Sequence, residues 1–206
     1  MLLALALVFF IAALFCLKID RRAAHYSREQ LNRPLWQFAL RVTDWAKGLP
    51  WIIAALVFYA TVQAIMASRG ETQFLRLVSD YSLALVVSFV VASVVLHGIK
   101  IFLGRRRPRD EFEHGLYGFR FFTWDLQYDS FPSGHSMTIV CVAVVLSAIA
   151  PILAPLWLML AIGLALTRAM LTAHFYSDVF AGAGIGILAA RETFLIGFPP
   201  LTPGWF

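Results

Sequence analysis

Charged residues are scarce in this chain of 206 residues, making up 14% of the sequence against 60% hydrophobic residues. The mean hydropathy is +0.76. Soluble domains carry roughly a quarter charged residues, and a soluble core of this length could not enclose so much apolar surface. The shortage of charge therefore excludes a soluble protein, and the lipid bilayer must be its solvent.

Cysteines and clustered acidic residues are also rare. The two cysteines, Cys16 and Cys141, both lie inside apolar runs, which is typical of small buried hydrophobes rather than of a disulfide pair. Nothing in the spacing of the carboxylates resembles a metal site, so neither a metal nor another cofactor is expected. Those nearest the polar part of the chain are scattered among aromatic residues, at Asp110, Glu111, Glu113, Asp125 and Asp129.

Basic residues give a formal net charge of +5 and are concentrated at positions 18–47 and 100–109. Such patches suit phosphates, either of lipid headgroups or of nucleic acid. In so apolar a chain the headgroups are the better partner. A lipid phosphate and the bilayer are therefore the expected partners, nucleic acid is not, and the oligomeric state is left open.

The apolar stretches predict an all-α fold, a polytopic membrane bundle of six transmembrane helices that forms a single domain over residues 1–206. Pro151 and Pro155 divide one long stretch into two helices joined by a tight turn. A cleaved signal peptide is the alternative for the first stretch, but its basic residues follow the apolar run instead of preceding it. The predicted spans are 1–17, 50–67, roughly 80–103, two within 136–171, and 178–197.

Residues 18–49 connect the first two spans and mix polar with aromatic residues. Apolar positions recur there at intervals of three and four residues, which predicts an interfacial amphipathic helix. A solvated connector is the alternative. The recurring positions are Leu31, Leu35, Phe38 and Val42.

Glycines alternate in the last span at Gly182, Gly184 and Gly186. No strand precedes them, so they do not form a dinucleotide-binding loop. Gly182 and Gly186 instead predict close packing of this helix against a neighbour.

The first of three clusters that carry ionisable residues is Lys100-x6-Arg107-Pro108. Ionisable residues at the ends of spans are functional candidates. Seven residues is nearly two helical turns, so Lys100 and Arg107 would share a face if the helix persists, although Gly104 and Pro108 indicate that it ends or bends nearby. An ordinary interfacial basic cluster would account for the arginines alone, which are Arg105, Arg106, Arg107 and Arg109.

The second cluster is Pro132-Ser133-Gly134-His135, at the start of a predicted helix. Ser133 suits an N-cap, and Gly134 allows close approach of a ligand. The free N–H groups and the positive end of the helix dipole predict a phosphate site beside His135.

The third cluster is Arg168-x5-His174-x3-Asp178, preceded by Thr167. His174 and Asp178 would be neighbours if the segment is helical, and a carboxylate on one imidazole nitrogen makes the other a better nucleophile or base. Arg168 can offer its planar fork to phosphate oxygens.

Taken together and in this order, the three clusters resemble the motifs of the type 2 phosphatidic acid phosphatase superfamily. Their motif-bearing region is residues 100–178, and Thr167 stands where the family usually has serine. The resemblance implies a metal-free membrane phosphatase in which His174 attacks phosphorus and forms a phosphohistidine, Asp178 orients His174, and His135 protonates the leaving group. It also implies that the phosphoryl oxygens are bound by Lys100, Arg107, Arg168 and the backbone at Ser133 and Gly134.

The substrate implied by the resemblance is a lipid phosphomonoester or diphosphate, such as phosphatidylglycerophosphate, phosphatidic acid, undecaprenyl diphosphate or a lipid A phosphate. Two alternatives remain open. The same phosphohistidine could pass phosphate to a second lipid, or the chain could be a non-catalytic lipid-phosphate carrier. Haloperoxidases carry similar motifs, but they are soluble.

The predicted location is the bacterial inner membrane, where relatives face their site toward the periplasm. Of the 17 Lys and Arg residues, 14 lie on the proposed catalytic side, and the positive-inside rule would place that side in the cytoplasm. The family resemblance favours the periplasmic orientation. The aromatic loop 110–131 is expected either to rest at the membrane interface, where it would shape headgroup access, or to pack on the helix ends.

Overall fold

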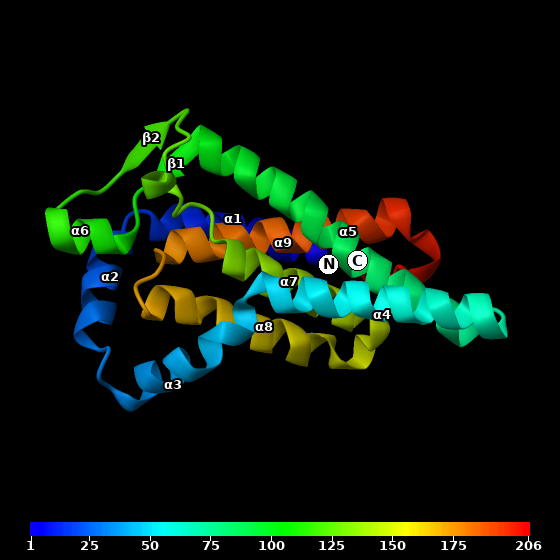
Figure 1. Ribbon diagram of the computed structural model, residues 1–206. Coiled ribbons are helices and arrows are strands. Elements are labelled where there is room, and N and C mark those ends of the chain that lie inside the picture. Colours follow the sequence, from blue (N-terminus) through cyan, green and yellow to red (C-terminus); the bar gives the residue numbers. More distant parts are fainter.

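The computed structural model describes residues 1–206, apart from the side chain of Leu126. It is a bundle of long helices with short helices and a small sheet gathered at one end (Figure 1). Every apolar stretch predicted as a span is helical. The long helices are α1 (Leu2–Cys16), α4 (Gly48–Arg69), α5 (Gln73–Phe102), α7 (Gly134–Ile149), α8 (Ala154–Met170) and α9 (Tyr176–Gly197).

Several of these helices are suited to a membrane. Judged by length and composition, four stretches can cross one, namely Pro34–Arg69, Gln73–Phe102, Pro151–Met170 and Tyr176–Gly197, and the bent pair α1 and α2 (Asp20–Glu29) would make a fifth. Helix α7 has 16 residues, fewer than a full span normally needs. The helical membrane fold is thus confirmed, whereas the count of six spans stays a prediction.

The segment 18–49 is helical, but it is not one helix. Helix α2 turns by 83° from α1, α3 (Pro34–Val42) follows, and the 3₁₀ helix η1 (Thr43–Ala46) leads into α4. Pro34 occupies the first turn of α3, where its missing N–H needs no partner, and it could not continue α2. The predicted single helix is therefore divided in three. Its place at the membrane interface stays a prediction, as does the alternative of a solvated connector.

The chain after α5 departs from a purely helical fold. Strand β1 (Leu103–Arg105) pairs antiparallel with β2 (Phe119–Phe121). Along the chain, α6 (Pro108–His114) lies between the two strands, and the 3₁₀ helix η2 (Leu126–Tyr128) follows β2. A Cβ on Gly104 would lie 2.2 Å from Thr123 Cγ2 and 2.8 Å from the Arg120 carbonyl oxygen, so this pairing requires glycine. The prediction of an all-α chain with a loop over 110–131 missed these elements because each is too short to show a periodic pattern.

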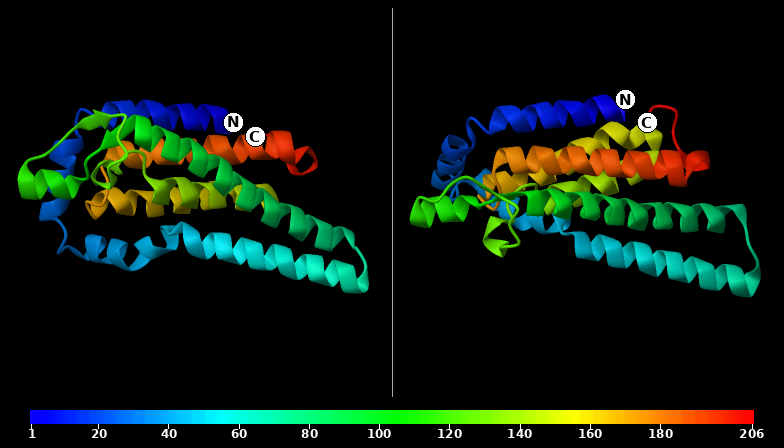
Figure 2. Two further views of the ribbon diagram at one scale, coloured as in Figure 1. Left: turned by 45° about the horizontal axis from the view of Figure 1, so that its top comes forward. Right: turned by 90° about the horizontal axis from the view of Figure 1, so that it is seen from above.

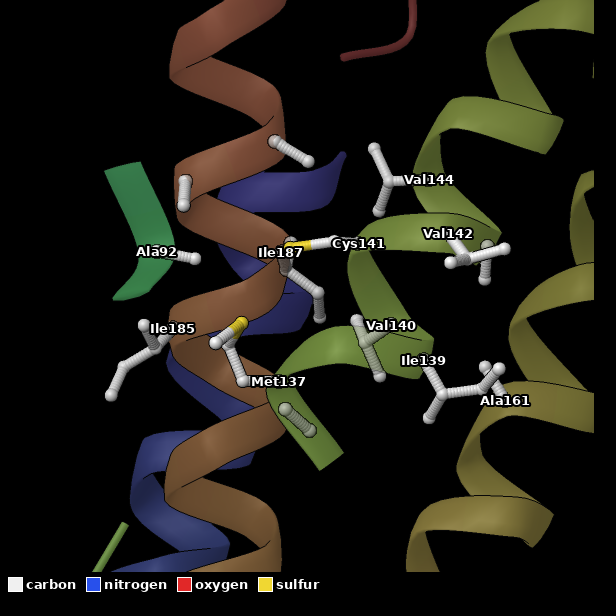
Figure 3. Close-up of a cluster of buried hydrophobic side chains, with 14 of the residues drawn as sticks. Ala92, Met137, Ile139, Val140, Cys141, Val142, Val144, Ala161, Ile185 and Ile187 are labelled. Atoms are coloured by element: carbon white, nitrogen blue, oxygen red, sulfur yellow. The ribbon is translucent and has the colours of Figure 1, made fainter. Parts of the chain in front are cut away.

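The core is centred on α7, which packs against α8 on one side and α9 on the other (Figure 3). Val140, Cys141 and Val144 are almost fully buried there. Both cysteines are free, as the sequence predicts. The 3₁₀ helix η3 (Pro151–Leu153) makes the tight turn that the prolines predict between α7 and α8.

Glycines set the spacing between α7 and α9. A Cβ on Gly182 would lie 2.2 Å from the Ser133 carbonyl oxygen, and one on Gly186 would lie 2.5 Å from that of Met137. The prediction of close packing at these two glycines is confirmed. Gly184 faces another neighbour, because its Cβ would lie 2.9 Å from the Phe10 ring of α1.

The two ends of the bundle differ. The α4–α5 pair projects beyond the other helices at one end, and the chain termini lie side by side in that half of the molecule (Figure 2). The Met1 amino group donates to the Phe206 carbonyl oxygen at 3.4 Å. At the other end lie α2, α6, the sheet, and the N-termini of α7 and α9 (Figure 1). The polar clusters of the sequence all map to this second end.

Candidate functional site

His174 lies in the turn between α8 and α9, and its side chain is only 3% exposed. The amides of Ala173 and His174 both donate to the Arg168 carbonyl oxygen, at 3.0 and 3.2 Å, which shapes the turn. His174 Nδ1 lies 2.9 Å from the Ser130 carbonyl oxygen. Because a carbonyl can only accept, Nδ1 carries the proton and Nε2 is left with its lone pair.

Burial also favours the neutral form of this imidazole. It lowers the pKa of His174 below its ordinary value, although the neighbouring Asp178 carboxylate opposes the shift. His174 is therefore neutral at neutral pH, with Nε2 free to act as a nucleophile or base.

Asp178 supports His174 by a route that the sequence does not reveal. Helix α9 begins at Tyr176, so His174 precedes the helix, and Asp178 Oδ2 lies 3.8 Å from Nδ1, too far for a hydrogen bond. Oδ2 instead accepts from the Ser130 hydroxyl at 2.6 Å and from the Phe175 amide at 2.9 Å. Ser130 thus links the two, since its carbonyl holds His174 and its hydroxyl holds Asp178.

The Pro-Ser-Gly-His segment begins α7 as predicted. Ser133 is the N-cap, and its hydroxyl accepts from the Ser136 amide at 3.4 Å. The expectation that the Ser133 backbone N–H binds phosphate is not met, because it donates to the Asp178 carbonyl oxygen at 2.9 Å. The amides of Gly134 and His135 donate to no residue in the described part of the chain, and they point from a helix N-terminus that favours an anion.

Lys100 and Arg107 do meet, but not on one helix face. Helix α5 ends at Phe102, and Arg107 follows β1. Asp129 brings them together, since Arg107 donates to both carboxylate oxygens at 2.7 and 2.8 Å and Lys100 Nζ donates to the Asp129 backbone carbonyl. Burial raises the pKa of the Asp129 carboxyl, but the hydrogen bonds and charge of Arg107 outweigh it and hold that pKa below its ordinary value. Asp129 is thus an ionised partner that occupies the Arg107 fork.

A residue in the segment that precedes α4 holds Arg168 in place. One of its amino groups donates to the Thr43 hydroxyl at 3.1 Å. The hydroxyl of Thr167 lies 2.9 Å from the same oxygen. The hydroxyl retained where the family usually has serine therefore helps to place Thr43 against Arg168.

The site opens outward beside Arg107. A hollow of about 400 Å³ is lined by Arg28, Arg107, Arg109, Phe112 and Thr172, among others. The charges of Arg107, Arg168 and His174 all act on His135, which is half-buried. Two histidines and three cations from the predicted clusters are thus brought to one end of the bundle.

Five contributing residues were missed in the sequence. Arg105 was assigned to an ordinary interfacial cluster, yet its side chain is 0% exposed and it donates to Asp178. In the sequence, Asp129 looks like one of several scattered carboxylates. The remaining three residues are Asp20, Thr43 and Ser130, and nothing in their spacing marks them as parts of a site.

The fold and the site define an integral membrane protein with a buried histidine among several cations. A family model described as the PAP2 superfamily matches residues 81–199, more than half of the chain. The chain belongs to that superfamily, which confirms the resemblance seen in its motifs.

Two curated relatives are named lipid A 1-phosphatase. The one from Rhizobium johnstonii (strain DSM 114642 / LMG 32736 / 3841) is 30% identical over 142 residues, which cover 65% of this chain and 58% of the relative. The one from Rhizobium etli (strain ATCC 51251 / DSM 11541 / JCM 21823 / NBRC 15573 / CFN 42) is 30% identical over 141 residues, covering 66% and 60%. The match therefore spans less than two thirds of these relatives.

Two crystal structures share the fold. Aquifex aeolicus LpxE has a TM-score of 0.56 at 20% identity, with 87% of this chain and 94% of that chain covered. A transmembrane PAP2 type phosphatidylglycerolphosphate phosphatase from Bacillus subtilis has a TM-score of 0.55 at 19% identity, with 99% and 98% covered. At these identities the likeness concerns the arrangement of the helices.

Proposed function

We propose that this protein is a membrane phosphatase that hydrolyses a lipid phosphomonoester or diphosphate through a phosphohistidine at His174. The observation that carries the proposal is the hydrogen bond from His174 Nδ1 to the Ser130 carbonyl, which leaves Nε2 unprotonated among cations. The names of the two curated relatives favour a phosphate of lipid A among the possible substrates. The remaining candidates are phosphatidic acid, phosphatidylglycerophosphate and undecaprenyl diphosphate.

The reaction proceeds in two displacements. His174 Nε2 attacks phosphorus and the bond to the leaving oxygen breaks, while His135 donates a proton to that oxygen. Lys100, Arg107 and Arg168 neutralise the equatorial oxygens, which is the main requirement of phosphoryl transfer. Water then attacks the phosphohistidine, with the now neutral His135 as base, and phosphate leaves with Nε2 restored.

Backbone amides complete the phosphate site. Those of Gly134 and His135 donate to the phosphoryl oxygens, since the Ser133 amide is engaged by Asp178. Substrate phosphate competes with Asp129 for the Arg107 fork, because a guanidinium binds carboxylate and phosphate in the same bidentate way.

The same proposal extends to the membrane arrangement. The single domain 1–206 crosses the bacterial inner membrane six times, and α2 and α3 rest at the interface. The two shortest spans are α1 with 15 residues and α7 with 16. The exposed Leu35 and Phe38 of α3 support contact with lipid. The site faces the periplasm.

Phosphate release is expected to continue with chelator present. The groups that face the substrate phosphate are cationic side chains and amides, so no metal ion is required to neutralise its charge. Purified protein in detergent would be assayed on the four candidate lipids with and without EDTA. Loss of activity with EDTA, restored by a divalent cation, would contradict the metal-free mechanism.

Thr43→Val is expected to lower kcat/KM about tenfold, because it removes a hydrogen bond to a guanidinium that is worth roughly 1.5–3 kcal/mol. Arg168 would then lose the partner that orients it. Thr61→Val, an exposed change on α4, is the matched control and should leave the rate unchanged. Equal rates for Thr43→Val and wild type would show that Arg168 does not depend on Thr43.

A further inference from the structure

Arg105 is a fully buried charge that the two displacements do not use. One of its amino groups donates to Asp178 Oδ1 and to the Ser177 hydroxyl, both at 2.6 Å. The other donates to Asp20 Oδ2 and to the Tyr117 hydroxyl, both at 2.8 Å. A guanidinium without solvent needs compensating charge, and Arg105 has two carboxylates.

Aromatic rings enclose this guanidinium. Its Cζ lies 4.2 Å from the centroid of Phe175, 4.9 Å from that of Phe119 and 5.4 Å from that of Tyr117. Ring faces attract a cation and keep water away from it. The ion pairs of Arg105 therefore act in a medium of low dielectric constant, where charges are felt strongly.

Asp20 is the far carboxylate of the group, at the start of α2, and its side chain is 0% exposed. It accepts from Arg105, from the Ser177 amide at 3.1 Å and from the Ser177 hydroxyl. Burial raises the pKa of the Asp20 carboxyl, whereas the charge of Arg105 and the hydrogen bonds from Arg105 and Ser177 oppose that shift and favour the ionised form.

The balance of charge behind His174 depends on Asp20. Arg105 alone would cancel the charge of Asp178, whereas two carboxylates around one guanidinium leave one net negative charge. That charge lies close to the nucleophile, since Asp178 Oδ2 is 3.8 Å from His174 Nδ1. A net negative charge there stabilises the positive imidazole that forms as Nε2 bonds to phosphorus.

We propose that Asp20 and Arg105 are positioning residues for catalysis: Arg105 orients Asp178, and Asp20 offsets the Arg105 charge so that Asp178 remains effective on His174. The inference rests on the proposed function, because both residues act through the nucleophile. It gives the N-terminal segment a part in the chemistry, although Asp20 lies 85 residues from Arg105 and 157 from Ser177.

The test compares four proteins in detergent, on whichever of the four candidate lipids the wild type hydrolyses fastest. They are the wild type, Asp20→Asn, the double variant Asp20→Asn/Arg105→Gln, and Arg76→Gln. The last removes an exposed ion pair with Glu71, away from the site, and should match the wild type. Steady-state kcat, KM and the pH dependence of kcat/KM would be measured for each.

Asp20→Asn is expected to lower kcat about tenfold or more, to change KM less than about threefold, and to move the acidic limb of kcat/KM to lower pH by about one unit. Without the Asp20 charge the imidazolium is less stable, so the pKa of His174 falls. The other charged or titratable groups facing His174 are common to the variants, so the difference reports Asp20. Those groups are Lys100 from α5, Arg107 and Asp129 from the connecting segment, His135 from α7 and Asp178 from α9.

The double variant separates charge from structure. Removing the Arg105 charge restores one net negative charge behind His174, so activity should recover at least about fivefold over Asp20→Asn and the acidic limb should return toward its original pH. A purely structural role predicts the opposite, because further hydrogen bonds are lost. A double variant less active than Asp20→Asn, or an unshifted limb in Asp20→Asn, would overturn the inference.

If Asp20→Asn does not yield folded protein, Arg105→Lys replaces it as the test variant. It keeps the charge balance but loses the planar fork, so a reduced kcat with an unshifted acidic limb is expected, and a shifted limb would overturn the inference. The two proposals fail differently. A wild type whose activity survives His174→Ala would refute the phosphohistidine, whereas dependence on His174 with no effect of Asp20 would refute only the charge balance.

Discussion

His174→Ala is expected to lower phosphate release at least about 10⁴-fold, because it removes the atom that bonds to phosphorus. KM should change much less, since Lys100, Arg107 and Arg168 still bind the phosphate. The measurement is phosphate release in detergent, together with alkaline-quenched trapping of labelled phosphoenzyme. The label should be absent from the variant.

His97→Ala is the matched control. His97 is exposed on α5, and its Nδ1 bonds the Ser93 carbonyl of its own helix at 2.8 Å. Its loss should leave both turnover and labelling unchanged. Label that persists in His174→Ala would place the covalent intermediate on another residue, and turnover that persists without label would indicate direct attack by water.

Gly182→Ala is expected to lower kcat about 100-fold, although the substitution adds only one methyl group. Its Cβ would lie 2.2 Å from the Ser133 carbonyl oxygen and 3.1 Å from the Ser133 carbonyl carbon, and a backbone cannot yield as a side chain can. Helices α7 and α9 would separate, which would weaken the bond from the Ser133 amide to Asp178 and move His135 away from His174. The free energy of unfolding should fall by about 1–3 kcal/mol.

Substitutions at two other glycines distinguish the loss of activity from the loss of stability. A Cβ on Gly163 of α8 meets nothing within 4 Å, so Gly163→Ala should leave activity unchanged and gain a little helix stability. Gly186→Ala creates a similar clash with Met137, one turn further from the site, so it should lose stability with a smaller loss of kcat. Wild-type activity in Gly182→Ala would show that the spacing of α7 and α9 does not position the two histidines.

Local patterns in the sequence predict much of this protein. Apolar runs alone place the long helices, because a helix in lipid must satisfy its own backbone and expose apolar side chains. The prolines at 151 and 155 place the turn between α7 and α8, and Gly182 and Gly186 predict the close packing of α9. Short elements such as β1 and β2 were not predicted, because three residues are too few to show a periodic hydrophobic pattern.

The sequence by itself determined the chemical groups of the candidate site, because a phosphoryl group calls for particular residue types at particular spacings near helix ends. Only the tertiary structure decided how they are joined. Ser130 links His174 to Asp178, Asp129 brings Lys100 to Arg107, and Asp20 reaches Arg105 across 85 residues. Residue type is the same for a buried and an exposed arginine, and what surrounds it depends on segments distant in the chain. That is why Arg105 resembles a surface charge in the sequence and lies at the centre of a buried ion-pair network in the fold.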